Sequence, residues 1–289
     1  MVGGRGFIGT HISRYYSAMG YNVLRLERGQ NLRVDNVIYS DYQDANWLKG
    51  QLRLLNNPIV FHMAAYIPPR EKITERCVFE ENKKIIDFFC HTFRDLTPKK
   101  VVYFSSIAVY GYGYRSLDWV NENSEIYIQD AYAEGKVYGE EKIRAMFSNS
   151  YILRLSSPFG VGRRNTGILE RIVASAQQNQ NICLHGRGNR TQDFIYINDI
   201  CQSTDKLLAS AQFGVYNLAS GFPCTMKQLA EMVIDIFSSK SLIAFRVLPE
   251  TDFVTVSNQK LRNTTGFCFM DIKEGLNHYK NALAVRGSE

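Results

Sequence analysis

Short apolar segments alternate with helix-like segments through the first half of this 289-residue chain. The helix-like segments carry apolar residues at intervals of three and four positions, as residues 79–93 do. The apolar segments have the length of buried strands and cover residues 21–27, 37–40, 59–64, 101–106 and 151–155. Strands separated by helices form βαβ units, which build a doubly wound parallel sheet with helices on both faces. The alternation therefore predicts an α/β fold.

After residue 158 the pattern changes to helices, glycine-rich turns and short strands. We predict a first domain over residues 1–158 and a smaller C-terminal α/β lobe over residues 159–289. Part of residues 193–218 is expected to return to the first domain. Doubly wound sheets bind ligands beyond the carboxyl ends of their strands, so we expect the smaller lobe to lie there and to hold the substrate.

Composition and charge exclude several classes of function. Apolar residues make up 45% and charged residues 21% of the chain, the balance of an ordinary globule. The net charge is +6, but the basic residues are scattered and do not form the stripe that favours nucleic-acid binding. No apolar run reaches the ~20 residues that span a bilayer, and no signal-peptide pattern opens the chain, so we expect a cytoplasmic protein. The six cysteines show no Cys-x-x-Cys spacing, and we expect neither a metal site nor disulfides.

A glycine-rich turn opens the chain. Gly3, Gly6 and Gly9 stand at intervals of three residues, with Phe7 and Ile8 inside the turn. Glycines at this spacing let backbone N–H groups approach a pyrophosphate at the start of a helix. Turns without a ligand are also rich in glycine, so the motif by itself leaves a structural turn and a dinucleotide site equally open.

Only Met1 and Val2 precede the first glycine of this turn. A dinucleotide-binding turn follows a strand, and in a doubly wound sheet that strand is central. We hypothesise that the natural protein, or its ancestor, carries about five further residues ahead of Met1, which give a strand of ordinary length.

Glu27 bears on the choice of cofactor because it ends the second predicted strand. An acidic side chain at this place accepts hydrogen bonds from the adenosine ribose and repels a 2′-phosphate. Its neighbour Arg28 would instead attract that phosphate. We therefore predict NAD, with NADP as the alternative, while a plain surface charge remains the structural reading of Glu27.

Two pairs of residues match the pattern Tyr-x-x-x-Lys: Tyr132 with Lys136, and Tyr138 with Lys142. On a helix each pair shares a face, but the two tyrosines are about 120° apart, so both pairs cannot serve one site. Asp130 is a suitable N-cap, which puts Tyr132 in the first turn of the helix. There the helix dipole and the neighbouring lysine are expected to lower the pKa of the tyrosine.

Glu140 and Glu141 lie between Tyr138 and Lys142. Adjacent carboxylates are typical of a solvent-exposed flank of a helix. We therefore expect the second pair on the surface, which leaves Tyr132 and Lys136 as the catalytic pair.

Ser105 and Ser106 end an apolar strand. Hydroxyl groups at the carboxyl edge of a parallel sheet lie near the ligand crevice. Because side chains alternate along a strand, only one of the two serines need face the ligand. The alternative is a pair of serines that hydrogen-bond their own backbone at the strand exit.

Together these segments resemble the extended short-chain dehydrogenase/reductase family, and within it the NAD-dependent epimerase/dehydratase group. The resemblance runs from Gly3 to about Gly275, almost the whole chain. The motifs that carry it are residues 3–9 (GGRGFIG), 40–42 (SDY), 62–65 (HMAA), Asn82, 105–111 (SSIAVYG), 132–136 (YAEGK), 154–160 (RLSSPFG) and 193–199 (DFIYIND).

The resemblance implies a Rossmann-type fold and a role for individual residues. Ser106 would hydrogen-bond a substrate oxygen and Tyr132 would be the acid/base. Lys136 would hold the nicotinamide ribose and tune Tyr132. Besides the glycine turn, the cofactor contacts that it implies come from Asp41, Tyr42, Met63, Ala64, Ala65, Asn82, Tyr132, Lys136, Ser156 and Ser157.

The chain departs from the family pattern at several places, among them Val2, where the family usually has threonine before the first glycine. Ile107 and Ala108 follow the catalytic serine where 4,6-dehydratases have Asp-Glu. Because water elimination needs its own acid and base, this departure argues against a dehydratase. Gln192 stands where many relatives have an arginine that grips the substrate diphosphate, and Arg190 lies two residues earlier. A second diphosphate-binding arginine of the family is absent, and Arg246 is the nearest candidate for its role. We expect Arg190, Gln192 and Arg246 to bind that end of the substrate.

These observations predict an enzyme that acts on a sugar, expected to be nucleotide-linked. Removal of a hydroxyl proton by Tyr132 with hydride transfer gives a ketosugar, and return of the hydride to the other face gives an epimer. We predict a 4-epimerase; the alternative, an NAD(P)H-dependent 4-ketosugar reductase, fits the short C-terminal lobe. A non-catalytic dinucleotide-binding protein is the third hypothesis, and the intact Ser106, Tyr132 and Lys136 argue against it. We further expect a homodimer and no nucleic-acid or membrane partner.

Overall fold

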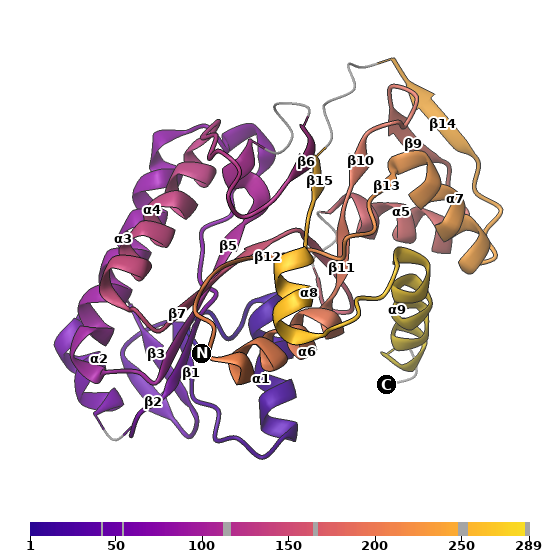
Figure 1. Ribbon diagram of the computed structural model, residues 1–289. Helices are drawn as coiled ribbons and strands as arrows, with labels where there is room; N and C mark the ends of the chain where they lie inside the picture. The colour runs from indigo at the N-terminus through magenta and orange to yellow at the C-terminus, as the bar shows by residue number, and fades with distance from the viewer. Residues whose placement is uncertain (42, 54, 112–116, 164–166, 248–253, 287–289) are drawn as a thin grey trace. The chain divides into compact units, whose positions relative to one another are not determined.

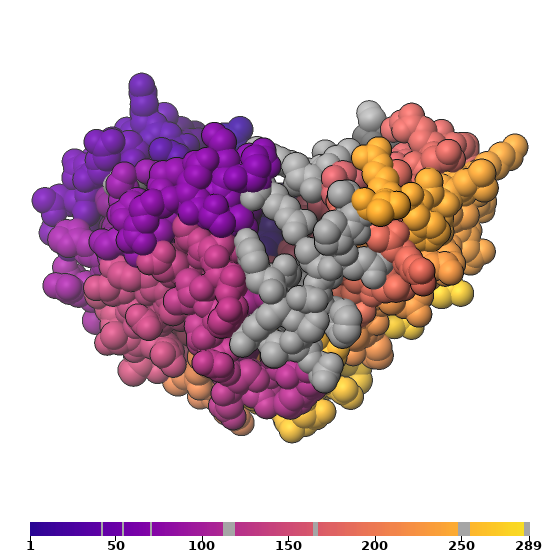
Figure 2. Space-filling model, turned by 90° about the horizontal axis from the view of Figure 1, so that it is seen from above, coloured from indigo at the N-terminus to yellow at the C-terminus, as the bar shows by residue number. Residues whose placement is uncertain are grey.

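The structure is a computed structural model that describes residues 1–41, 43–53, 55–111, 117–163, 167–247 and 254–286. The remaining residues are grey in Figure 1 and Figure 2. The chain divides into two compact units. The first unit comprises Met1–Gly111, Glu125–Leu155 and Thr204–Tyr216, and the second comprises Tyr112–Ser124, Ser156–Ser203 and Asn217–Glu289.

The first unit is built on parallel strands. β1 (Arg25–Arg28) pairs in parallel with β3 (Val37–Ser40), and β2 (Leu32–Val34) lies antiparallel on the far side of β3. A second group has the order β12-β7-β5-β4 and contains β4 (Ile59–His62), β5 (Lys100–Ser106), β7 (Ser150–Leu155) and β12 (Gly214–Leu218). β4 with β5, and β5 with β7, are parallel. The helices of this unit are α1 (Phe7–Ala18), α2 (Ala45–Leu52), α3 (Arg76–Phe93), α4 (Ala131–Met146) and the short η1 (Arg70–Lys72), η2 (Arg94–Leu96) and η3 (Ile107–Tyr110).

Val2 joins the two groups of strands into one sheet. It forms parallel bridges to Leu26 of β1 and to His62 of β4. The strand order is therefore β2-β3-β1-Val2-β4-β5-β7-β12, and the start of the chain lies in the middle of the sheet (Figure 1). The predicted α/β fold with a doubly wound parallel sheet is confirmed.

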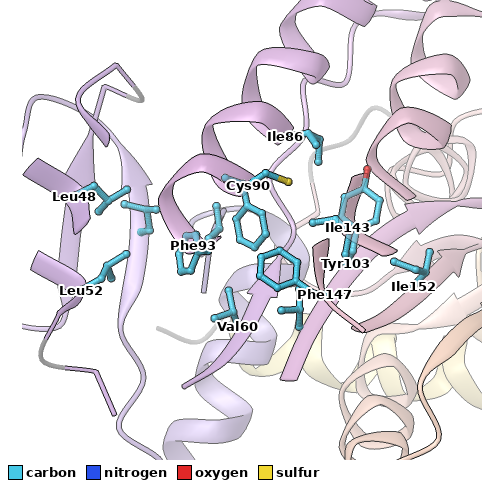
Figure 3. Packing of buried hydrophobic residues seen from close by; sticks show 14 of the residues in the cluster. Leu48, Leu52, Val60, Ile86, Cys90, Phe93, Tyr103, Ile143, Phe147 and Ile152 are labelled. Atoms are coloured by element: carbon cyan, nitrogen blue, oxygen red, sulfur yellow. The ribbon is translucent and has the colours of Figure 1, made fainter. Parts of the chain in front are cut away.

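Buried apolar side chains from strands and helices form the core of this unit (Figure 3). Val60 of β4 and Tyr103 of β5 pack in one cluster with side chains of α2, α3 and α4. Parallel strands covered on both faces bury nearly every side chain, which explains their continuous apolar runs. All six residues of β7 are accordingly buried.

The second unit contains paired short strands and helices. β8 (Ser157–Phe159) is parallel to β11 (Phe194–Tyr196), and β10 (Thr191–Gln192) is antiparallel to β13 (Cys224–Thr225). β9 (Ile182–His185) pairs with β14 (Ile243–Arg246), and β6 (Leu117–Val120) with β15 (Val254–Val256), both in parallel. Its helices are α5 (Ile168–Gln177), α7 (Met226–Ile236), α8 (Gln259–Thr265), α9 (Ile272–Arg286) and the first part of α6 (Ile197–Ser210).

The sequence-based division into residues 1–158 and 159–289 leaves residues 117–124 in the first domain, whereas in the structure they cluster with the second unit. Their partner strand β15 is far away in sequence, and local patterns carry no information on such a pairing. Among the described residues, no helix is long and apolar enough to cross a membrane, and no three potential ligand side chains gather as a metal site.

Candidate active site

The glycine turn between Val2 and α1 is shaped by close backbone approaches. Gly3 has a φ of +82°, and a Cβ on it would lie 2.7 Å from the Ala64 nitrogen. A Cβ on Gly9 would overlap the carbonyl oxygen of Gly3 and lie 2.8 Å from the Cα of Gly4. These glycines are therefore required by the geometry of the turn.

The turn ends at the N-terminus of α1, where Gly6 is the N-cap. No side chain caps this helix end, and its first turn holds no acidic residue. Phe7 and Ile8 begin the helix, so their backbone N–H groups belong to the helix end that carries the positive pole of the dipole. An open glycine cradle at such a helix end fits the pyrophosphate of a dinucleotide.

The two acidic residues predicted to meet the adenosine lie near the carboxyl ends of the neighbouring strands β1 and β3. Glu27 in β1 is buried, and its carboxylate is 3.5 Å from the guanidinium of Arg25, while Arg28 is exposed. Asp41 directly follows β3 and is exposed, with Oδ1 accepting a hydrogen bond from the Gln43 N–H. Tyr42 lies outside the described residues.

The loop after β4 connects the glycine turn to α3 and α4. Met63 donates its N–H to the Val2 carbonyl at 2.9 Å, and Ala64 lies against Gly3. Ala65 is partly buried one residue further on. The amide of Asn82 on α3 binds both the N–H and the carbonyl of Tyr66, each at 3.0 Å.

Asn82 also packs against α4. A Cβ added to Gly135 of α4 would lie only 2.9 Å from the Cβ of Asn82. The side chain thus bridges the loop beyond the glycine turn and the helix that carries Tyr132 and Lys136. The cofactor contact that the resemblance implies for Asn82 stays a prediction.

Ser106, Tyr132 and Lys136 come together at the end of β5. Asp130 caps α4 by accepting the Ala133 N–H at 2.7 Å, which puts Tyr132 in the first turn as predicted. The side chain of Ser106 lies near enough to the Tyr132 hydroxyl to act on its pKa, and its Oγ accepts the Ala108 N–H at 3.1 Å. The ammonium of Lys136 donates to the Phe104 carbonyl at 2.7 Å and lies 5.8 Å from the centre of the Tyr132 ring.

Burial controls the protonation of this cluster. It raises the pKa of Tyr132 to about 12, with the side chain of Ser106 acting in the opposite direction and the charge of Asp130 adding to the rise. Burial also lowers the pKa of Lys136 to about 8, which the carboxylate of Glu140 opposes. The expectation that the pKa of Tyr132 is lowered is therefore wrong, because desolvation outweighs the other effects.

The second Tyr-x-x-x-Lys pair lies elsewhere on α4. The hydroxyl of Tyr138 donates to Asp87 on α3 at 2.5 Å, and its ring packs edge-on against Phe79. Lys142 is exposed and lies 5.4 Å from the centre of the same ring. Tyr138 therefore helps to join two helices and takes no part in the cluster around Tyr132.

A buried ion pair lies beneath the cluster, and it was missed by the sequence reasoning. Glu140, expected to face solvent, is only 3% exposed and binds Arg154 of β7 at 2.7 Å. Its carboxylate also accepts the hydroxyl of Ser105 at 2.6 Å, so the two serines have different partners. The arginine in an otherwise apolar strand, and the four-residue spacing from Lys136 to Glu140, are the signals that could have found it.

The remaining predicted residues belong to the second unit. The hydroxyl of Ser156 donates to Asp193 at 2.6 Å, and Ser157 accepts a hydrogen bond from the side-chain amide of Gln192. Arg190 in turn donates to the Gln192 side chain at 3.0 Å. Arg246 is exposed at the end of β14, paired with His185 on a separate two-stranded sheet.

A doubly wound sheet with a glycine cradle at α1 and a Ser–Tyr–Lys cluster at β5 defines a dinucleotide-binding protein of the extended short-chain dehydrogenase/reductase class. Comparison with known sequences assigns the chain to a family within this class. The chain belongs to the NAD-dependent epimerase/dehydratase family, whose sequence model matches residues 1–219. The family prediction is confirmed, and NAD as the expected cofactor agrees with it.

Similar proteins carry out different reactions. The chain is 24% identical over 265 residues to dTDP-D-glucose 4,6-dehydratase of Dictyostelium discoideum, covering 82% of this chain and 61% of that protein. It is also 24% identical over 262 residues to dTDP-4-dehydro-6-deoxy-D-allose reductase of Streptomyces bikiniensis, covering 82% of this chain and 80% of that protein. Among solved structures, the UDP-glucose 4-epimerase of Thermus thermophilus in complex with NAD is similar with a TM-score of 0.82 and 19% identity, over 98% of this chain and 97% of that chain. Family membership therefore leaves the reaction open.

Proposed function

We propose that this chain is an NAD-dependent enzyme that acts on a nucleotide-linked sugar by hydride transfer, and that its reaction is 4-epimerisation. The single observation that carries the proposal is the cluster of Ser106, Tyr132 and Lys136 at the end of β5, in which Lys136 is buried and the other two are partly buried. A phenol with a hydroxyl and a buried ammonium close by can exchange a proton with a sugar hydroxyl.

The glycine cradle and its neighbours would hold the cofactor. In this assignment Gly3, Gly6 and Gly9 admit the pyrophosphate, and Glu27 receives the adenosine ribose. Lys136 would bind the nicotinamide ribose. When bound, NAD supplies the acceptor and donor of hydride at the sugar carbon.

Tyr132 and Ser106 would handle the substrate oxygen. Ser106 orients the hydroxyl, and Tyr132 takes its proton and later returns it. Ile107 is buried and Ala108 apolar, so the positions after Ser106 provide no acid and base for water elimination. For this reason we propose an epimerase and not a dehydratase, although a dehydratase is among its relatives.

The second candidate, a 4-ketosugar reductase, is favoured by one observation. A dTDP-4-dehydro-6-deoxy-D-allose reductase is among the similar proteins, and reduction of a ketone needs a proton donor such as the Tyr132 hydroxyl. An epimerase uses both protonation states within one turnover. The two reactions therefore differ in whether external reducing cofactor is consumed.

The test is to purify the protein without added nucleotide, identify any bound nucleotide by mass spectrometry, and then offer UDP- and dTDP-linked hexoses followed by NMR. An epimerase interconverts C4 epimers without added NADH or NADPH. Consumption of either cofactor with a 4-keto sugar nucleotide, in the absence of epimerisation, would replace the epimerase by the reductase. Absence of both reactions would overturn the proposal.

A further inference from the structure

Glu140 lies one helical turn beyond Lys136 on α4, and both side chains are buried. Glu140 is 3% exposed and Lys136 is 5% exposed. Side chains four residues apart on a helix are neighbours on one face. A buried carboxylate and a buried ammonium are therefore neighbours on α4, beside the cluster that the proposed reaction uses.

Arg154 and Ser105 fix the carboxylate of Glu140. Both of its oxygens lie 2.7–3.2 Å from guanidinium nitrogens of Arg154, and one of them also accepts the Ser105 hydroxyl at 2.6 Å. Arg154 donates in addition to the hydroxyl of Tyr110 at 2.9 Å. Because these partners belong to β7, β5 and η3, the carboxylate has a defined place relative to the strand end where Ser106 lies.

Lys136 depends on this carboxylate for charge balance. Its ammonium donates to a neutral group, the Phe104 carbonyl, at 2.7 Å. Burial lowers the pKa of Lys136 to about 8, and the charge of Glu140 opposes that fall. Lys136, Glu140 and Arg154 thus form a buried set of two cations and one anion. Removal of the anion would favour loss of the Lys136 proton.

The other titratable groups around Lys136 are neutral at pH 7. The rings of Tyr103 on β5 and Tyr132 on α4 lie 5.2 and 5.8 Å from the ammonium, and burial raises the pKa of both phenols. Burial and the charge of Lys136 lower the pKa of His62 on β4 to about 3. Burial raises the pKa of Cys90 on α3, which adjoins Tyr103, to about 11. Among the described residues, the negative charge that acts on Lys136 is therefore the carboxylate one turn away.

We propose that Glu140 is a positioning residue of this active site: its buried carboxylate, fixed by Arg154, keeps Lys136 in the ammonium form. An ammonium has three donors, so with one given to the Phe104 carbonyl it retains two for the hydroxyls of a ribose. A neutral amine would retain one. The proposal rests on the proposed function for the use of Lys136, whereas the charge of Lys136 is measurable without cofactor or substrate.

The experiment follows Lys136 itself, by NMR of cofactor-free protein labelled with ¹³C at the lysine Cε atoms. The resonance of Lys136 is the one that Lys136→Met lacks, and its change with pH gives the titration midpoint. In Glu140→Gln the midpoint should fall by about one pH unit or more, because the countercharge is lost. Ser105→Ala is the matched control: it removes a hydrogen bond to the same carboxylate but no charge, and should shift the midpoint by less than about 0.3 pH unit.

The direction of the shift separates a charge effect from a loss of packing. A variant that only loosens the site lets water reach Lys136, which raises the midpoint toward 10.5. Arg154→Met leaves the Glu140 charge without its partner and should also raise the midpoint, opposite to Glu140→Gln. A midpoint that rises or stays unchanged in Glu140→Gln would overturn the proposal.

The double variant Glu140→Gln/Arg154→Met leaves neither charge behind and replaces Glu140→Gln if that protein does not fold. The midpoint should fall there too, since the carboxylate is the group that acts on Lys136, and a rise or no change would again overturn the proposal. Turnover of sugar nucleotides is measured separately on the unaltered chain. Its absence, together with the expected shift of the midpoint, would count against the proposed reaction and support the role of Glu140.

Discussion

Glu140 of α4 and Arg154 of β7 form a buried ion pair, with 2.7 Å between a carboxylate oxygen and a guanidinium nitrogen. A second guanidinium nitrogen lies 3.0 Å from the other carboxylate oxygen, and Ser105 donates to that same oxygen. The pair therefore ties the helix that carries Tyr132 and Lys136 to the end of β5, where Ser106 lies.

Loss of one partner of this pair should destabilise the protein more than loss of both. Glu140→Gln leaves the Arg154 charge buried, and we expect a cost of about 3 kcal/mol in the free energy of unfolding. The double variant Glu140→Leu/Arg154→Met removes both charges and should cost less. Urea unfolding of the two variants measures this, and a larger loss in the double variant would contradict it.

Tyr132→Phe should abolish turnover because it removes only the hydroxyl that exchanges a proton. We expect a loss of at least ~10²-fold in kcat, with NAD affinity nearly unchanged. Tyr138→Phe is the matched control on the same helix, since its hydroxyl binds Asp87, and it should retain most activity. Equal activity of the Tyr132 variant and the unaltered chain would remove Tyr132 from the mechanism.

Lys136 should make stability depend on alkaline pH. Its pKa in the folded protein is lowered to about 8 from 10.5, so between these values the unfolded chain binds more protons and folding becomes more favourable as pH rises. Between pH 8 and pH 10 the free energy of unfolding should rise by about 2 kcal/mol more in the unaltered chain than in the Lys136→Met variant. Urea titrations of both proteins at the two pH values measure the difference, and parallel pH profiles would contradict the assignment.

Glu27 should set the preference for NAD over NADP. Its carboxylate lies near the end of β1. Glu27→Gln removes the repulsion between this carboxylate and a 2′-phosphate, so the affinity for NADP should rise on the order of tenfold. The affinity for NAD should fall or remain unchanged. Arg28→Ala is the neighbouring control. If the arginine variant, and not the Glu27 variant, changes the ratio of the two dissociation constants, Arg28 decides cofactor choice.

Gly9→Ala should weaken both the fold and cofactor binding, because the added Cβ overlaps the backbone of Gly3 and Gly4. Gly50 is the contrasting position: it is exposed on α2 and a Cβ there meets nothing within 4 Å. Gly50→Ala should stabilise the helix by about 0.5–1 kcal/mol and leave NAD affinity unchanged. Thermal unfolding and NAD titration separate the two outcomes.

The sequence by itself determined the features that depend on local chain geometry. The alternation of apolar strands and helices predicted the parallel sheet. The side-chain periodicities of strands and helices depend only on residues that are close in sequence. Asp130 predicted the start of α4, and with it the position of Tyr132 in the first helical turn, since capping is a contact between residues three apart. The glycine spacing likewise predicted a turn before the first helix, and in the structure a Cβ on Gly3 or Gly9 would overlap the backbone there.

Only the tertiary structure decided what those residues face. Glu140 has the local sequence of an exposed residue, yet Arg154 reaches it from a strand across the fold and both are buried. The pKa of Tyr132 rises because the folded chain removes water from it, an effect that no sequence spacing contains. Residues 117–120 pair with a strand near the end of the chain, and long-range pairing of this kind depends on the complete fold, since its partners are not encoded near one another.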